Sequence, residues 1–107
     1  METKDFTVLL VEDDLNDIFL VKRAFKLTEL HVPLQVVTDG QDAISYLKGD
    51  GKYADRTAHP VPHLIVMDIH MPGMDGFETT RRIMASTPCA ITMAIIIAGS
   101  ITALFPK

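Results

Sequence analysis

Apolar runs alternate with amphipathic segments along most of this chain and predict alternating strands and helices. Continuous apolar runs at 6–11, 34–38, 64–67 and within 93–98 are typical of strands buried on both faces. Between them, apolar residues recur at helical spacing over 15–29, 41–48 and 75–86. Segment 49–62 is rich in Gly, Pro and polar residues, so we expect a loop there. This order of elements predicts an α/β fold with parallel strands.

Two of the predicted strands end in carboxylates. Glu12 and Asp13 follow the first strand, and Asp68 follows the apolar run of the third. The carboxyl ends of parallel strands meet at one edge of a sheet, where open α/β proteins bind their ligands. Clustered carboxylates repel one another and require a cation, and oxygen ligands favour Mg²⁺. The pattern therefore predicts an acidic Mg²⁺ site, with Asp14 as the N-cap of the following helix.

Composition narrows the class of protein. A chain of 107 residues with 48% hydrophobic residues suits one folded domain, spanning 1–107. The net charge of −4 and the lack of a basic block argue against a nucleic-acid partner. Cys89 is the single cysteine, so no internal disulfide can form, and the charged segment METKDF lacks the apolar core of a signal peptide. These features favour a cytoplasmic protein.

Charge is distributed unevenly, because no charged residue lies between Ile83 and Pro106. A membrane span needs roughly 20 apolar residues without polar interruption. Thr92, Gly99, Ser100 and Thr102 interrupt this stretch. We therefore prefer a buried strand with flanking segments to a transmembrane helix.

The motifs LLVEDD at 9–14, DG at 39–40 and LIVMDIHMPGMDG at 64–76 resemble those of a response-regulator receiver domain. A small hydroxyl residue after the fourth apolar strand extends the resemblance over about residues 5–102. The loop ending in AHPVPHLIVMD is similar to that of the subfamily associated with bacterial phytochromes. The resemblance implies a flavodoxin-like, doubly wound parallel sheet. It also implies a phosphoacceptor in two-component signalling, whose partner is a sensor histidine kinase.

The same resemblance implies a role for each site residue. Asp68 matches the phosphoacceptor, Asp13 the direct Mg²⁺ ligand, and Glu12 the carboxylate that holds Mg²⁺ mainly through water. The backbone carbonyl of His70 matches a further Mg²⁺ ligand. Ser100 matches the switch hydroxyl, with Thr102 as the competing residue. Such a domain is not an enzyme beyond its own phosphoryl transfer and hydrolysis.

The C-terminal part departs from the family pattern. Receiver domains have a fifth strand and a Lys that precedes a Pro, whereas Lys107 here follows Pro106. We therefore expect an incomplete sheet of about four strands that lacks the usual last strand and helices. An exposed apolar edge on the fourth strand favours pairing. This predicts a homo-oligomer formed through that edge, or a return of 101–105 over the gap.

Two other functions remain open from the residues alone. A shortened receiver could serve as a non-phosphorylated interaction or assembly domain whose acidic site binds metal without phosphoryl transfer. An Mg²⁺-dependent phosphohydrolase would use an Asp nucleophile, but that class usually places a second Asp two residues later, where this chain has His70. We rank the hydrolase last. Phosphorylation of Asp68 distinguishes the phosphoacceptor from the assembly domain.

Overall fold

The computed structural model describes residues 6–27, 32–68, 76–86 and 93–97, with backbone alone for 68, 76, 77, 80, 84, 86 and 93–97. Its elements are β1 (Val8–Val11), α1 (Leu15–Leu27), β2 (Leu34–Val37), α2 (Gly40–Lys48), the short 3₁₀ helix η2 (Gly51–Tyr53), β3 (Leu64–Asp68), α3 (Gly76–Ser86) and β4 (Met93–Ile97). The strands of this described part form one sheet in the order β2-β1-β3-β4. All pairs are parallel, which confirms the predicted α/β fold.

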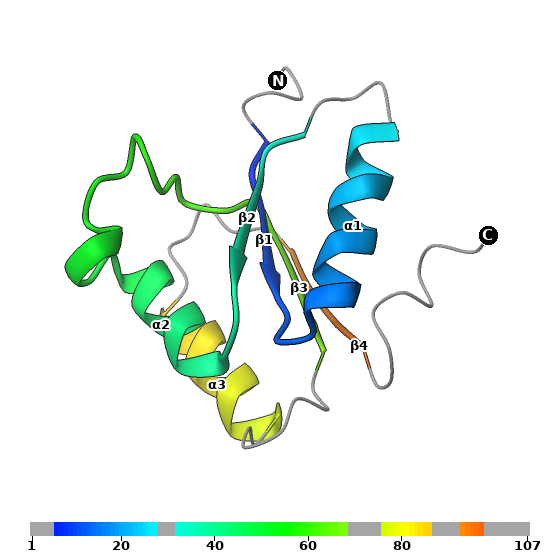
Figure 1. Cartoon of the computed structure of the whole chain (residues 1–107). Helices are drawn as coiled ribbons and strands as arrows, with labels where there is room; N and C mark the ends of the chain where they lie inside the picture. Colours follow the sequence, from blue (N-terminus) through cyan, green and yellow to red (C-terminus); the bar gives the residue numbers. More distant parts are fainter. Residues whose placement is uncertain (1–5, 28–31, 69–75, 87–92, 98–107) are drawn as a thin grey trace.

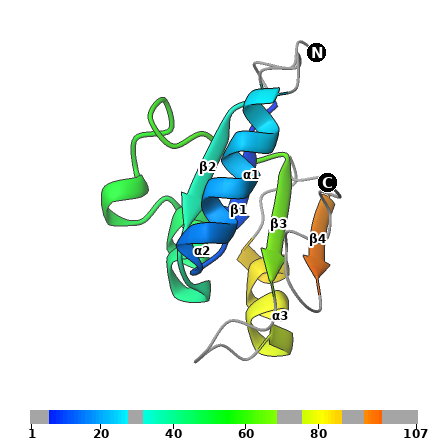
Figure 2. The ribbon, with the colours of Figure 1, turned by 45° about the vertical axis from the view of Figure 1, so that its right-hand side comes forward.

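The helices cover both faces of the sheet. Figures 1 and 2 show α1 on one face and α2 with α3 on the other, so the sheet is the middle of three layers. The central strand β1 is buried along its whole length. Its residues therefore have no polar face, as expected for a parallel strand between two helical layers.

Alternation along β1 divides the core into two clusters. Leu9 and Val11 belong to the larger one, which also contains the buried side chains of α2 and Tyr53. Leu10 points to the other face and packs with Ile18 and Val21 of α1. Successive strand residues face opposite sides, so one apolar strand supports both layers.

Carboxylates cap the first two helices. The Asp14 Oδ1 atom accepts hydrogen bonds from the backbone N–H groups of Asn16 at 2.8 Å and Asp17 at 3.1 Å. This confirms the predicted N-cap. The Asp39 Oδ1 atom accepts in the same way from the Asp42 N–H at 2.7 Å. Asp39 thus caps α2, and Gly40 of the DG motif is the first, buried residue of that helix.

The predicted limits of two segments need correction. The first strand begins at Val8, because Phe6 stacks on the ring of His63 with centroids 5.1 Å apart instead of extending the strand. The segment 49–62 contains η2, so it is not wholly a loop. Its aromatic residue Tyr53 is buried in the core and brings this turn against α2.

Segment 49–63 is tied closely to the end of α2. Gly49 adopts φ +73° there, and its N–H bonds the Tyr46 carbonyl while the Asp50 N–H bonds the Ser45 carbonyl, a Schellman cap. Arg56 then donates to the carbonyls of Tyr46 and Leu47, both at 2.9 Å. The end of α2 therefore keeps hydrogen-bond partners for carbonyls that a helix leaves unpaired.

An aromatic group supports the same segment. Tyr46 is 1% exposed and donates its hydroxyl to the Pro60 carbonyl at 2.7 Å. The rings of Tyr53 and His59 pack on it with centroids 5.0 and 5.9 Å away. Burial raises the pKa of Tyr46 to about 12, although the nearby Arg56 guanidinium acts to lower it. The phenol is therefore kept neutral inside the fold.

The last strand pairs with β3 from Leu64↔Met93 to Asp68↔Ile97. This confirms a strand in the charge-free stretch. In the part of the chain that the structure describes, no helix is long and apolar enough to cross a membrane. The predicted return of 101–105 lies outside the described residues. Pairing through the edge of β4 stays a prediction.

Candidate functional site

Parallel register brings the carboxyl ends of the strands to one edge of the sheet. Val11 of β1 lies opposite Val37 of β2 and Met67 of β3. Glu12 therefore follows β1 at the same level at which Asp68 ends β3. The backbone at this edge is held by a hydrogen bond of 3.0 Å from the Glu12 N–H to the Val37 carbonyl. The two acidic motifs, more than fifty residues apart, meet here.

Glu12 is a buried carboxylate with a fixed orientation. Its residue is 1% exposed, and its Oε1 atom accepts the Asp14 N–H at 3.0 Å. The same turn lets Asp14 cap α1, so one short segment both starts the helix and orients the glutamate. A buried carboxylate is costly unless polar partners or a cation stabilise it. The burial of Glu12 therefore suits a carboxylate that is stabilised by polar partners or by a cation at this edge of the sheet.

Asp13 differs from Glu12 in its surroundings. It is exposed, next to the N-terminus of α1. The described side chains form no ion pair with it. The site thus has one carboxylate exposed to solvent, that of Asp13, beside one buried in the fold, that of Glu12. Oxygen donors of this kind fit Mg²⁺, which keeps several water ligands and needs only one or two carboxylates.

The predicted site is described only in part. Among the described side chains, which do not include that of Asp68, no group of three His, Cys, Asp or Glu residues could hold a metal. The backbone of Asp68 is described as the last residue of β3. His70, Ser100 and Thr102 lie outside the described residues. The structure thus brings together Glu12, Asp13 and the backbone position of Asp68.

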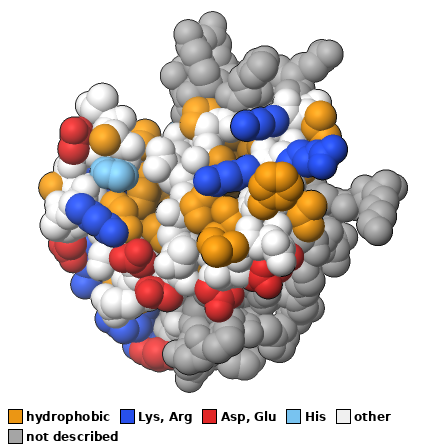
Figure 3. All heavy atoms as spheres, viewed as in Figure 1, with side chains coloured by type: hydrophobic (Ala, Val, Ile, Leu, Met, Phe, Trp, Pro, Cys, Tyr) orange, Lys and Arg blue, Asp and Glu red, His pale blue; other side chains and the backbone are white. Residues whose placement is uncertain are grey.

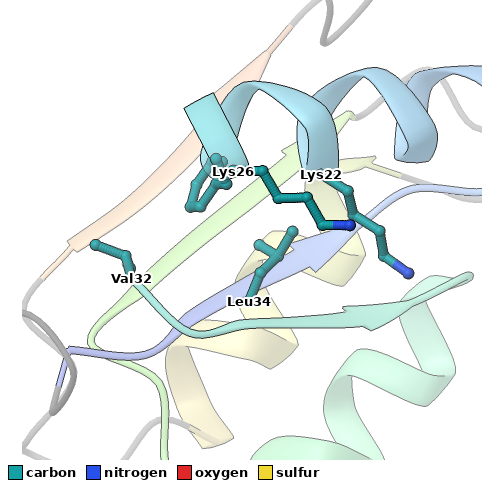
Figure 4. A pocket seen from close by; sticks show the side chains of 5 residues that line it. Lys22, Lys26, Val32 and Leu34 are labelled. Atoms are coloured by element: carbon teal, nitrogen blue, oxygen red, sulfur yellow. The ribbon is translucent and has the colours of Figure 1, made fainter. Parts of the chain in front are cut away.

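A second feature was not predicted from the sequence. A hollow of about 340 Å³ lies between α1 and β2, lined by Lys22, Phe25, Lys26, Val32 and Leu34 (Figure 4). In the sequence, both lysines lie between the apolar positions of the first helix. The i, i+4 spacing of Lys22 and Lys26 is the signal that puts both on one side. The hollow is remote from the acidic edge.

Comparison with known proteins identifies relatives over most of the chain. The family model described as "Response regulator receiver domain" matches residues 8–103. A protein-glutamate methylesterase/protein-glutamine glutaminase of Pseudomonas syringae pv. tomato is 37% identical over 89 residues, which are 83% of this chain and 24% of that protein. The chain thus spans about a quarter of the length of this relative.

Solved structures show the same architecture. Response regulator RPA3017, from red light signaling of R. palustris, superposes with a TM-score of 0.74 at 26% identity and covers 92% of this chain and 70% of its own. The bacteriophytochrome response regulator RtBRR gives a TM-score of 0.70 at 28% identity, over 92% of this chain and 59% of its own. These similarities agree with the resemblance to the phytochrome-associated subfamily.

Proposed function

This chain belongs to the response regulator receiver family, and from that premise we propose that Asp68 accepts a phosphoryl group from a sensor histidine kinase. Receiver domains are phosphoacceptors in two-component signalling, and they interact with such kinases. The observation that supports Asp68 is the register that sets it level with Glu12 and Asp13 at one edge of the sheet. We propose this chain as a phosphoacceptor and not as an enzyme acting on other substrates.

The proposed transfer is an in-line displacement at phosphorus. A carboxylate oxygen of Asp68 forms the new O–P bond while the P–N bond of the kinase phosphohistidine breaks, and the histidine nitrogen leaves with the electron pair. The protein contributes position and compensation of charge. Asp68 is the last residue of β3, which pairs with β1 on one side and β4 on the other, and this supports the positioning part.

Members of the receiver family typically bind Mg²⁺, and the residues here fit that ion. We propose that Asp13 and Asp68 would hold it directly, Glu12 through water, and the His70 carbonyl as a further ligand. When bound, Mg²⁺ would neutralise charge on the phosphoryl oxygens. The hydrogen bond from the Asp14 N–H keeps the Glu12 carboxylate oriented for this role.

A hydroxyl switch completes the proposal. Phosphorylation would add a charge of about −1.5 to −2 and new acceptor oxygens at the end of β3. Ser100, or Thr102 in its place, would donate its hydroxyl to these oxygens and carry the segment after β4 with it. We propose that this movement transmits the signal, in a cytoplasmic protein.

The test is intact-mass spectrometry after incubation with acetyl phosphate, with Mg²⁺ or with EDTA. We expect one phosphoryl adduct that requires both Mg²⁺ and Asp68. Asp68→Asn keeps the shape but removes the nucleophile, so it should give no adduct. Asp50→Asn, an exposed aspartate on the loop after α2, is the matched control and should be modified normally. An adduct that persists in Asp68→Asn would reject Asp68 as the acceptor.

A further inference from the structure

One side of α1 carries an apolar half and a basic half in a single row. Leu15, Phe19, Lys22 and Lys26 are spaced i, i+4, i+7 and i+11, which places them in line along the helix, and we name these four residues the α1 row. Leu15 is 78% exposed and Phe19 62% exposed. Both lysines are also exposed. A single exposed apolar residue is common, but two neighbouring ones in line with two cations are typical of an interaction surface.

Charge along α1 follows the same division. Asp13 and Asp14 stand exposed at its start, and Lys22, Arg23 and Lys26 stand exposed toward its end. Within the described residues, none of these three cations forms an ion pair. In Figure 3 the blue side chains gather over the upper part of α1, with hydrophobic side chains beside them and red ones below. This basic end stands in a chain of net charge −4.

The basic half also borders a cavity. Lys22 and Lys26 line the hollow of about 340 Å³, whose remaining walls are the partly buried apolar residues Phe25, Val32 and Leu34. In Figure 4 the Lys26 side chain extends above Leu34, and the Lys22 side chain lies to one side of it. The hollow therefore offers an apolar floor below a positively charged rim. It fits an apolar side chain that has carboxylates close by.

The other end of α1 carries such a group. We propose that a second copy of this chain docks here through α1, with the two helices antiparallel about a two-fold axis. In this arrangement Leu15 lies opposite Lys26 of the second copy, and Phe19 lies opposite Lys22. Leu15 and Phe19 of each copy contact the hollow of the other copy. The acidic N-terminus of each α1 lies next to the basic C-terminal end of the other α1, and Lys22 of one copy lies over the ring of Phe19 of the other. The contact is self-complementary, as a two-fold interface requires.

The size of the helix limits the affinity. The 13 residues of α1 are about 20 Å long, so the contact falls below the roughly 1,200 Å² of a standard interface. We expect a dissociation constant on the order of 100 μM at low salt, weakening as salt screens the paired charges. The row starts beside Asp13, so the dimer would also narrow access to the acidic edge. That last consequence rests on the proposed function, whereas the dimer itself does not.

Sedimentation equilibrium without Mg²⁺ or phosphate donor tests the dimer directly. Loading from about 10 μM to about 1 mM covers the range expected for a small interface. Lys22→Glu/Lys26→Glu should raise the dissociation constant more than about tenfold, because like charges then face each other. Lys48→Glu/Arg82→Glu makes the same charge change on α2 and α3 and should leave it nearly unchanged. Phe19→Ala should weaken the dimer, and Leu27→Ala, exposed on another side of α1, should not.

A mixing experiment then tests the antiparallel arrangement. Asp13→Lys should weaken self-association on its own, yet it should pair with Lys22→Glu/Lys26→Glu, because each variant supplies the charge that the other now lacks. Recovery of dimer in the mixture supports the proposal. A monomer at about 1 mM and low salt would overturn it and leave the row to a different partner protein. A dimer indifferent to Lys22 and Lys26 would also overturn it, in favour of pairing through β4.

Discussion

Tyr46 shows how one side chain links α2 to the loop that follows it. Its ring is buried in the larger core cluster, and its hydroxyl reaches the Pro60 carbonyl at 2.7 Å. A buried hydroxyl needs such a partner, because leaving it unpaired costs about 1–3 kcal/mol. The residue thus combines apolar packing with a single polar contact 14 positions away in sequence.

The raised pKa of Tyr46 predicts a loss of stability in alkaline solution. Its pKa rises from 10.0 to about 12 in the fold, because burial disfavours the phenolate. Below pH 10 both states keep the proton, so this contribution is fully present. Between pH 10 and 12 only the unfolded chain loses the proton, and the free energy of unfolding should fall by about 1–2 kcal/mol. Urea unfolding at pH 8 to 11.5 measures this fall.

Tyr46→Phe is the control for the alkaline prediction. It removes the titrating group, so the free energy of unfolding should decline less steeply above pH 10. Part of the decline should remain, because burial also raises the pKa of Tyr53. The variant should also lose about 1 kcal/mol at neutral pH with its hydrogen bond to Pro60. An unchanged alkaline slope would contradict the assignment to Tyr46.

At the scale of elements, several hydrogen bonds together hold the end of α2. The Schellman cap at Gly49 and the Arg56 guanidinium act on neighbouring carbonyls. Arg56 also bonds the His59 carbonyl at 3.2 Å, so the same side chain holds the following turn. The two glycines of this junction differ, although both have positive φ.

Gly49→Ala and Gly51→Ala separate backbone strain from crowding. Both glycines lie in the left-handed region, where a side chain costs about 1 kcal/mol or more. A Cβ at Gly49 would also lie 2.9 Å from Arg56 Nη2, whereas one at Gly51 meets nothing within 4 Å. Arg56 is fixed by its hydrogen bonds, so we expect a loss of about 2 kcal/mol for Gly49→Ala and about 1 for Gly51→Ala. Equal losses in urea unfolding would exclude a contribution from crowding.

The strands and helices that were predicted correctly are those with a clear local pattern of apolar residues. Apolar runs and helical spacing identified the strands and helices. Burial between two helical layers requires an apolar residue at every position of β1, so this strand is visible as an apolar run in the sequence. The turn η2 was missed because it lies within 49–55, where Gly and Asp dominate, while its order depends on Tyr53, which reaches the core. Such contacts have no signal at short range.

At the scale of the molecule, parallel register converts distant motifs into one acidic edge. Carboxylates at the ends of neighbouring strands were predicted to converge, and β1 and β3 do pair at that level. The burial of Glu12 and its hydrogen bond to the Asp14 N–H could not be predicted, because they depend on how the chain turns into α1. The hollow beside β2 likewise results from packing of α1 on the sheet.

Relief of repulsion at this edge predicts stabilisation by Mg²⁺. For a dissociation constant on the order of 1 mM, about 10 mM Mg²⁺ should add about 1.4 kcal/mol and raise Tm by about 6 °C. Asp13→Asn should remove most of this response and slightly raise Tm without metal, because one like charge is lost. Thermal unfolding with MgCl₂ and then with excess EDTA measures both effects.

Asp50→Asn makes the same chemical change at an exposed position on the loop after α2 and should keep the full Mg²⁺ response. A response of equal size in Asp13→Asn would mean that the ion acts elsewhere on the chain.

The closure of α2 by Arg56 has a consequence for proteolysis. Segment 49–63 has the composition of a cleavable linker, yet its backbone N–H groups at Gly49, Asp50, Tyr53, Ala54 and His59 are already hydrogen-bonded. A protease binds several residues of its substrate in an extended conformation. In this segment that conformation requires these hydrogen bonds to break and the core around Tyr46 to open. Cleavage in this segment should therefore report on opening of the domain as a whole, at the rate at which α2 separates from the sheet.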